Sequence, residues 1–254
     1  MKTPVFILSD FGAEDTYTAQ MKAAILSFAG YDTPVIDLTP KVGRGNVLHG
    51  AFHLRAALPH LPCGSVTLVV VDPGVGTDRL GLAALWRGRY LVAPDNGLVS
   101  LLPGPVSFWK LPPPERNASN TFHGRDYFAP CAARLSVDPG WTDFLEPHDN
   151  PVLLPFPQGA PSAEGLAASV LHTDHFGNCI LSLTPEQVAG LVVTDLMTSG
   201  GSIPLKTVSC YADEPSGREL LFLRGSQGFM EIALSGGSAA EASTWFREWM
   251  SSWP

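Results

Sequence analysis

The sequence predicts an α/β protein in which an N-terminal mixed, mostly parallel sheet is flanked by helices and followed by a smaller C-terminal β-barrel domain. The patterns of the two halves of the chain, and the proline-rich stretch between them, support this fold class. Short apolar runs that suit strands buried on both faces alternate with helical patterns over the first 135 residues. After about residue 160 only short strands and turns follow. Between these halves, residues 147–165 contain five prolines, so no regular element is expected there.

The first half is expected to alternate strands and helices. Expected strands are 5–8, 35–38 and 65–71, and expected helices are 16–29 and 46–58. Residues 82–86 and 90–93 are expected to form a hairpin, which makes the sheet mixed. A short helix is expected after Pro94-Asp95-Asn96-Gly97, and another from His123-Gly124-Arg125-Asp126 to about Leu135.

The composition change predicts two domains, an N-terminal catalytic domain at 1–158 and a C-terminal barrel at 163–254. The expected barrel strands are 166–172, 178–183, 203–210, 219–224 and 228–234. A terminal helix is expected near 239–250.

Composition narrows the class of protein. The net charge of −8 comes without a basic cluster, so a nucleic-acid partner is not expected. No apolar run approaches a membrane span or a signal-peptide core, so we expect a cytoplasmic protein. The four cysteines, Cys63, Cys131, Cys179 and Cys210, form no CxxC pair and are expected to be buried thiols.

Polar turns follow the predicted strands, where ligands of open α/β sheets bind. Asp10 follows the first strand directly and suits either of two roles, binding a ribose diol or capping the next helix. Asp72 and Arg79 flank a glycine-rich turn after the third strand. Such a pair can aim a guanidinium at an anion or a water, or can simply staple the turn.

Histidines supply further candidates. His123 precedes a predicted helix and is suited to proton transfer, or to a structural hydrogen bond. His49 and His53 have the spacing of a metal pair, with His60 downstream. The glutamate of the zinc-protease signature is absent, so no metal site is predicted.

Two turns of the second half have polar groups suited to a heterocyclic ligand. One is Thr173 to Asn178, with an acid, an aromatic and an amide; the other is Ser226 to Ala233. Either is also consistent with an ordinary turn between strands. The nucleophile, phosphate-loop and dinucleotide signatures are absent, so neither a covalent mechanism nor a nucleotide cofactor is predicted.

Six segments, taken in order, resemble the S-adenosyl-L-methionine (SAM) hydroxide adenosyltransferase family, the relatives of the fluorinating and chlorinating adenosyl enzymes. The resemblance spans about residues 4–240. Its segments are Ser9-Asp10-Phe11-Gly12, Val71 to Thr77, Pro94-Asp95-Asn96-Gly97, Thr121 to Asp126, Phe176-Gly177-Asn178 and Gly228 to Ile232.

The resemblance implies hydrolysis of SAM to adenosine and methionine, with SAM as substrate and without a cofactor or metal. It implies a homotrimer whose active sites lie between one subunit's N-terminal domain and a neighbour's barrel. The implied water-activating residues are Asp72, Arg79 and His123. The implied substrate-binding residues are Asp10, Asp174, Asn178, Ser226, Phe229, Glu231 and Ala233.

This chain departs from the family pattern at Pro40, at Leu181-Ser182 and at Gln227. Two alternatives remain. Halide-dependent adenosyl transfer is one, but the halogenating relatives have tyrosine at Asp72, serine at Gly124 and an insertion near residue 88. A binding module for adenosine or SAM without catalysis is the other, and such a module would not require the Asp72, Arg79 and His123 set.

Overall fold

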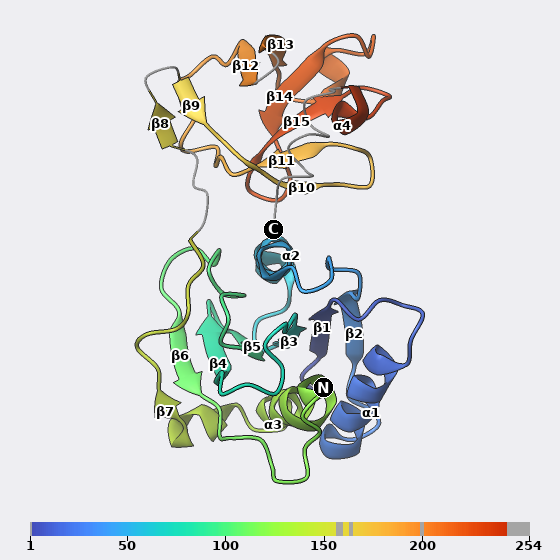
Figure 1. The fold of residues 1–254 in the computed structure, drawn as a ribbon, viewed down its shortest axis with the longest axis vertical. Helices are drawn as coiled ribbons and strands as arrows, with labels where there is room; N and C mark the ends of the chain where they lie inside the picture. Colours follow the sequence, from blue (N-terminus) through green and yellow to red (C-terminus); the bar gives the residue numbers. More distant parts are fainter. Residues whose placement is uncertain (1, 156–159, 163–164, 199–200, 243–254) are drawn as a thin grey trace. The chain divides into compact units, whose positions relative to one another are not determined.

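The computed structural model describes residues 2–155, 160–162, 165–198 and 201–242. The chain divides into two compact units, Met1–Phe156 and Pro157–Pro254, and each is described by itself. Figure 1 shows the course of the chain through both.

The first unit contains a seven-stranded sheet in the order β2-β1-β3-β5-β4-β6-β7. Strands β2, β1, β3 and β5 are parallel, and β4, β6 and β7 pair antiparallel, so the predicted mixed sheet is confirmed. The elements are β1 (Val5–Ser9), α1 (Tyr17–Ala29), β2 (Val35–Thr39), α2 (Val47–Ala57), η1 (Leu58–His60), β3 (Val66–Val70), β4 (Gly81–Trp86), β5 (Arg89–Pro94), β6 (Ser107–Lys110), η2 (Gly124–Phe128), α3 (Ala129–Val137), η3 (Pro139–Phe144) and β7 (Glu146–Pro147).

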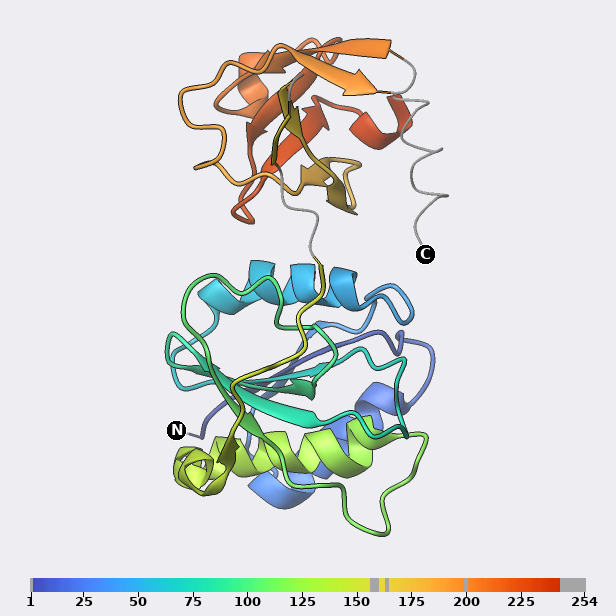
Figure 2. The same ribbon diagram turned by 60° about the vertical axis from the view of Figure 1, so that its left-hand side comes forward.

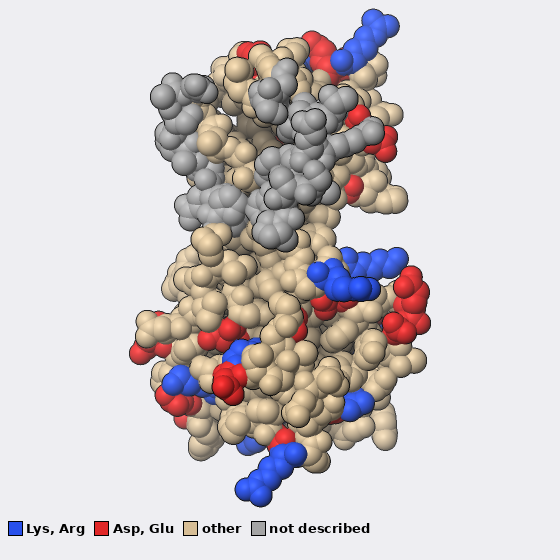
Figure 3. Space-filling model, in the orientation of Figure 1, with Lys and Arg blue, Asp and Glu red and all other residues tan. Residues whose placement is uncertain are grey.

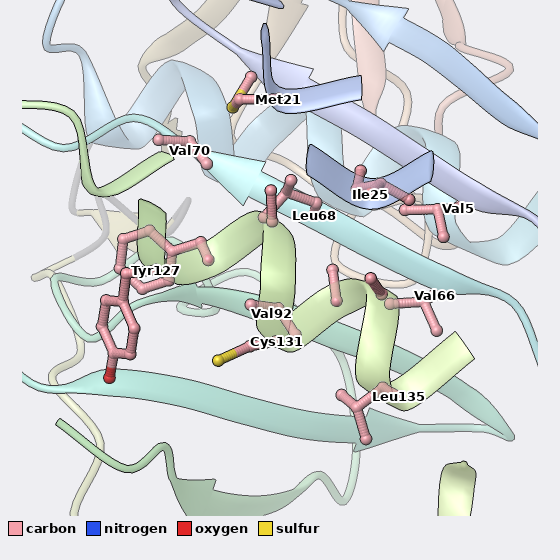
Figure 4. Close-up of a cluster of buried hydrophobic side chains, with 14 of the residues drawn as sticks. Val5, Met21, Ile25, Val66, Leu68, Val70, Val92, Tyr127, Cys131 and Leu135 are labelled. Carbon is pink, nitrogen blue, oxygen red and sulfur yellow. The ribbon is translucent and has the colours of Figure 1, made fainter. Parts of the chain in front are cut away.

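Helices cover both faces of this sheet, with α2 on one face and α1 and α3 on the other (Figure 2). Because side chains of a strand alternate between faces, β1 supplies Val5 and Ile7 to one core and Phe6 and Leu8 to the other. The core beneath α1 and α3 is drawn in Figure 4. Burial on both faces explains why these strands are continuous apolar runs.

The second unit contains a curled six-stranded sheet in the order β10-β11-β15-β14-β13-β12 and a two-stranded ribbon, β8-β9. The sheet forms a half-barrel, in agreement with the predicted fold class. The elements are β8 (Ala160–Ser162), β9 (Gly165–Ala167), β10 (Val170–Thr173), β11 (Cys179–Leu181), β12 (Asp195–Thr198), β13 (Gly201–Thr207), η4 (Tyr211–Asp213), β14 (Leu220–Arg224), β15 (Met230–Leu234) and α4 (Ala239–Ala242).

Several local predictions were wrong. Strand β8 lies inside the proline-rich stretch, because a two-stranded ribbon consists of edge strands, which tolerate proline. No helix follows Pro94 to Gly97; successive turns fill the space because Gly97 has a φ of 103° and Pro103 follows soon. The short strands β6 and β12 were missed, and the expected strand 166–172 is split into β9 and β10. The predicted terminal helix lies outside the described residues beyond Ala242.

The prediction of four buried thiols holds for only two of them. Cys131 and Cys179 are buried, and burial raises the pKa of each thiol to about 12. Cys63 lies in the turn before β3 and Cys210 precedes η4, and both are exposed because these turns face solvent.

Acidic and basic side chains are interspersed over the face drawn in Figure 3. In the described part of the chain, no helix is both long and apolar enough to cross a membrane.

Candidate active site

The candidate site begins where the buried strand β3 ends. Val71 is buried, and the turn that follows it carries Asp72, two glycines and Arg79 before β4 begins at Gly81. Gly76 has a φ of 80°, and a Cβ on it would lie 2.6 Å from the backbone oxygen of Asn120. Glycine therefore lets this turn pack directly against the segment that leads to His123.

The structure brings Asp72, Arg79 and His123 together, with Arg79 in direct contact with both of the others. Arg79 Nε lies 2.9 Å from each carboxylate oxygen of Asp72, and its Nη2 donates to Asp72 Oδ2 as well. The same Nη2 lies 2.8 Å from His123 Nδ1. The side chains of Arg79 and Asp72 are only 10% and 5% exposed, and His123 is 5% exposed.

This geometry determines the tautomer of His123. A guanidinium has donors but no acceptor, so Nδ1 of His123 must accept the hydrogen bond from Arg79. The proton of the neutral ring is then on Nε2. Burial lowers the pKa of His123, and the neighbouring Arg79 cation lowers it further, against the opposing effect of Asp72 and Asp126. His123 is therefore a neutral ring whose Nε2–H is available as a donor.

The low pKa of His123 predicts a specific titration. The neutral ring should persist as the pH falls past the ordinary histidine pKa of about 6.5, and should gain a proton only below it. In an Arg79→Gln variant the repelling cation is absent, so the pKa should move up toward that ordinary value.

The measurement is NMR titration of the histidine C2–H resonances, with an Asn substitution of His123 to assign its signal. Titration of His123 at or above the ordinary value in the unmodified protein would contradict the contact with Arg79.

A π-helical turn, η2, follows His123 and was not predicted. The amide of Ala129 donates to the carbonyl oxygen of Gly124, an i→i+5 bond. A turn of this width brings residues five apart toward one face. His123 and Phe128 accordingly both contact Arg79, whose guanidinium lies 5.1 Å from the Phe128 ring centroid.

Asn96 was not predicted to lie near Asp72. Its Nδ2 donates to the carbonyl of Val71 at 2.8 Å and so holds the backbone directly before Asp72. The segment Pro94 to Gly97 is one of those that resemble the family. The contact of Asn96 with Val71 depends on the pairing of β3 with β5, which the sequence did not predict.

Asp10 lies at the end of β1, next to β3 in the sheet. Its Oδ2 accepts a hydrogen bond from the amide of Gly45 at 2.7 Å. It does not cap α1, which begins after Thr16. Pro40, one of the departures, lies close by, since its carbonyl accepts from the Gly12 amide at 2.7 Å. The Asp10 turn is thus braced by the segment before α2.

His49 and His53 contact each other in α2. The amide of Gly43 donates to His49 Nδ1 at 3.0 Å, so the proton of neutral His49 is on Nε2. That nitrogen lies 2.9 Å from His53 Nε2. The contact is therefore a hydrogen bond from the Nε2–H of neutral His49 to His53 Nε2. His60 is exposed at the end of η1.

Three aromatic rings come from the segments next to Asp10 and His123. Phe11, Tyr17 and Phe122 have centroids 5.1 to 5.4 Å apart, and they come from the segments that follow Asp10 and precede His123. They are an apolar wall that the separate motifs did not predict, because its members are distant in the sequence.

In the second unit, Asp174 and Asn178 belong to one turn. Asp174 Oδ1 accepts from the amides of Phe176 and Asn178, and its Oδ2 accepts from Asn178 Nδ2 at 3.0 Å. Asn178 is buried and Phe176 is exposed. Asp174 therefore shapes the turn, and the Phe176 ring remains exposed to solvent.

Glu231 is a buried acid of β15. It accepts a hydrogen bond from Tyr211. Burial raises the pKa of Glu231, the Tyr211 bond opposes this, and the Asp174 carboxylate raises it again. Glu231 and Asp174 are thus near each other, and the resemblance implies that both bind substrate.

The remaining predicted residues of this unit differ in exposure. Phe229 and Ala233 are fully buried, whereas Ser226 is exposed in the turn before β15. Gln227 has a buried Oε1 with no hydrogen-bond partner among the residues that the structure describes. Tyr211 was not predicted, because the acid that it contacts, Glu231, is 20 residues away in the sequence.

Comparison with known proteins shows which family this chain matches. Residues 5–144 match the SAM hydroxide adenosyltransferase N-terminal domain, and residues 168–245 match the C-terminal domain. A protein of Thermus thermophilus named (R)-S-adenosyl-L-methionine hydrolase is 38% identical, with 94% of each chain covered. A protein of Salinispora tropica with the same name is 38% identical, over 92% of this chain and 90% of its own.

Solved structures agree with the fold. An uncharacterized conserved protein from Thermotoga maritima has a TM-score of 0.85 at 27% identity, over 94% of this chain and 95% of its own. A conserved hypothetical protein from Thermus thermophilus has a TM-score of 0.71 at 36% identity, with 94% of each chain covered.

Proposed function

This chain belongs to the SAM hydroxide adenosyltransferase family, and from that premise we propose that it hydrolyses SAM to adenosine and L-methionine. One observation carries the proposal: a buried carboxylate and a neutral imidazole are joined by one guanidinium at the end of β3. Since the relatives are named for the R form of SAM, that diastereomer is the proposed substrate.

The chemistry requires little beyond an aligned nucleophile. The sulfonium leaves C5′ of the ribose as neutral methionine, so departure needs no general acid, metal or cofactor. A water held in line with the C5′ to sulfur bond gains from orientation in a nearly dry site. SAM is thus a substrate of this site.

The contacts support a distinct role for each of the three residues. His123 Nδ1 is occupied by Arg79, so the ring offers the Nε2–H to the water oxygen. Asp72 Oδ1 has one bond from Arg79 and can accept the water proton. A weak base suffices because the water becomes strongly acidic as it bonds to carbon. Arg79 holds the side chains of Asp72 and His123 in place.

Halide transfer is less well supported by this site. The carboxylate of Asp72 would repel a halide in a tight pocket. A serine in place of Gly124 would also be crowded, because a Cβ there would lie 3.0 Å from Met21 Sδ and 3.3 Å from a ring carbon of Phe11.

Asp10 is the proposed holder of the ribose hydroxyls. In the described part of the chain its Oδ1 has no hydrogen-bond partner, while Oδ2 is held by Gly45. An Asp10→Asn variant should raise KM for SAM about tenfold by losing a charge-assisted bond, with a smaller effect on kcat.

The check is a 2′-deoxy analogue of SAM. The unmodified protein should bind the analogue more weakly than SAM, and the variant should discriminate much less between them. Equal discrimination by both proteins would assign Asp10 to bracing the Gly45 loop alone.

The proposed activity is tested by incubating the purified protein with SAM and separating the products by chromatography. Equal amounts of adenosine and methionine, independent of halide, are expected. Binding without adenosine would indicate a binding module, and a halide-dependent product would indicate adenosyl transfer to halide.

We further propose a homotrimer, because the family resemblance implies that residues of both halves contribute to each active site from neighbouring subunits. Sedimentation velocity should give three times the mass of the 254-residue chain. A monomer that is fully active would exclude this assembly.

A further inference from the structure

Tyr127 connects the two segments that bring Arg79 and His123 together. It lies in η2, four residues after His123, and it is 5% exposed. Its ring meets the His123 imidazole edge to face, with centroids 5.8 Å apart and planes at 82°. Figure 4 shows the ring at one end of the core cluster, with the hydroxyl directed toward a neighbouring strand.

The hydroxyl reaches the start of β4. The hydroxyl oxygen of Tyr127 packs against the backbone of Gly81, two residues after Arg79 in the chain. Tyr127 therefore contacts His123 with its ring and packs its hydroxyl against the backbone next to Arg79. The next residue, Phe128, packs on the Arg79 guanidinium.

Gly81 makes this contact sterically possible. A Cβ at position 81 would lie 2.2 Å from the Tyr127 hydroxyl oxygen and 2.7 Å from its Cζ. No real Cβ is found so close, so any larger residue would displace the ring. The glycine and the tyrosine form a matched pair across η2 and β4.

The hydroxyl is not suited to acid or base chemistry. Burial raises the pKa of Tyr127 well above the ordinary tyrosine value, so the group stays neutral throughout the range in which enzymes work. Its contribution must come through geometry.

We propose that Tyr127 is a positioning residue for the hydrolytic site, which sets the separation of Arg79 and His123 by joining Gly81 to the π turn. The inference rests on the proposed hydrolysis of SAM. Small displacements of groups that orient a nucleophile have large effects on rate. Binding of SAM should not depend on Tyr127, because its contacts are with the Arg79 and His123 segments.

The test is Tyr127→Phe, which removes the hydroxyl and keeps the ring. We expect kcat to fall about tenfold with KM unchanged within about twofold, since only the alignment of the catalytic residues is lost. Tyr90→Phe is the matched control, because Tyr90 packs against the same core at the far end of β5 and should keep full activity.

The Gly81→Ala variant, alone and combined with Tyr127→Phe, is a second test of the proposal. If both residues act through one contact, the double variant should be no slower than the worse single variant by more than about twofold. Fully multiplicative effects, or a Tyr127→Phe protein with unchanged kcat, would overturn the proposal. A fall in kcat matched by Tyr90→Phe would also overturn it, as a general packing effect.

Folding is checked by circular dichroism, and Tyr127→Phe alone decides the matter if Gly81→Ala does not fold. The unmodified protein is assayed first in every series. Absence of adenosine there would refute the proposed function, whereas normal activity in both the unmodified protein and Tyr127→Phe would refute only the role of Tyr127.

Discussion

An Asp72→Asn variant is expected to lose about a thousandfold in kcat, the scale seen when a group that acts only in the transition state is removed. We propose two functions for the carboxylate. It neutralises Arg79, whose side chain is 10% exposed, and it is the acceptor for the water proton. An amide of the same shape has neither the charge nor the basicity.

The measurement is steady-state production of adenosine, together with calorimetric titration of SAM. KM should stay within about threefold, because Asp72 is assigned to the water and not to the substrate. Asp78→Asn is the matched control, since Asp78 is an exposed acid of the same turn. Activity near the original level in Asp72→Asn would remove the carboxylate from the mechanism.

An Arg79→Lys variant is expected to lose about a hundredfold in kcat although the positive charge is kept, because alignment of the catalytic groups is lost. Arg79 contacts both oxygens of Asp72 and Nδ1 of His123 with one planar group. An ammonium has a single nitrogen and cannot span these partners. It also loses the planar contact with the Phe128 ring.

The control for this variant is Arg116→Lys, in an exposed loop of the same unit. The same assay applies, with the histidine NMR titration as a second observable. If lysine preserves the rate, charge alone explains the role of Arg79 and the forked geometry is incidental.

The candidate site could be predicted in part because its components follow buried strands. Val69 to Val71 are apolar because β3 is covered on both faces. The first polar residue after such a run, Asp72, must lie at the carboxyl end of the strand. The turn glycines and Arg79 follow within the same segment. Local sequence therefore indicated the Asp72 to Arg79 pair.

Contacts that depend on other geometry were missed. The π turn places Phe128 beside Arg79 with a five-residue spacing, which a search for helical periodicity of 3.6 does not detect. Asn96 contacts the end of β3 from the turn after β5, and Tyr127 contacts β4 from η2, so both contacts depend on how these elements are arranged in space. Strand β6 has only four residues and β12 is partly exposed, so neither shows a strong pattern.

The most direct test of the central claim is hydrolysis of SAM in water enriched in oxygen-18, followed by mass spectrometry of both products. Attack of water on C5′ forms the new carbon–oxygen bond on the ribose and leaves sulfur in methionine. The account predicts one labelled oxygen in adenosine and none in methionine. Unlabelled adenosine, or methylthioadenosine accompanied by labelled homoserine, would contradict it.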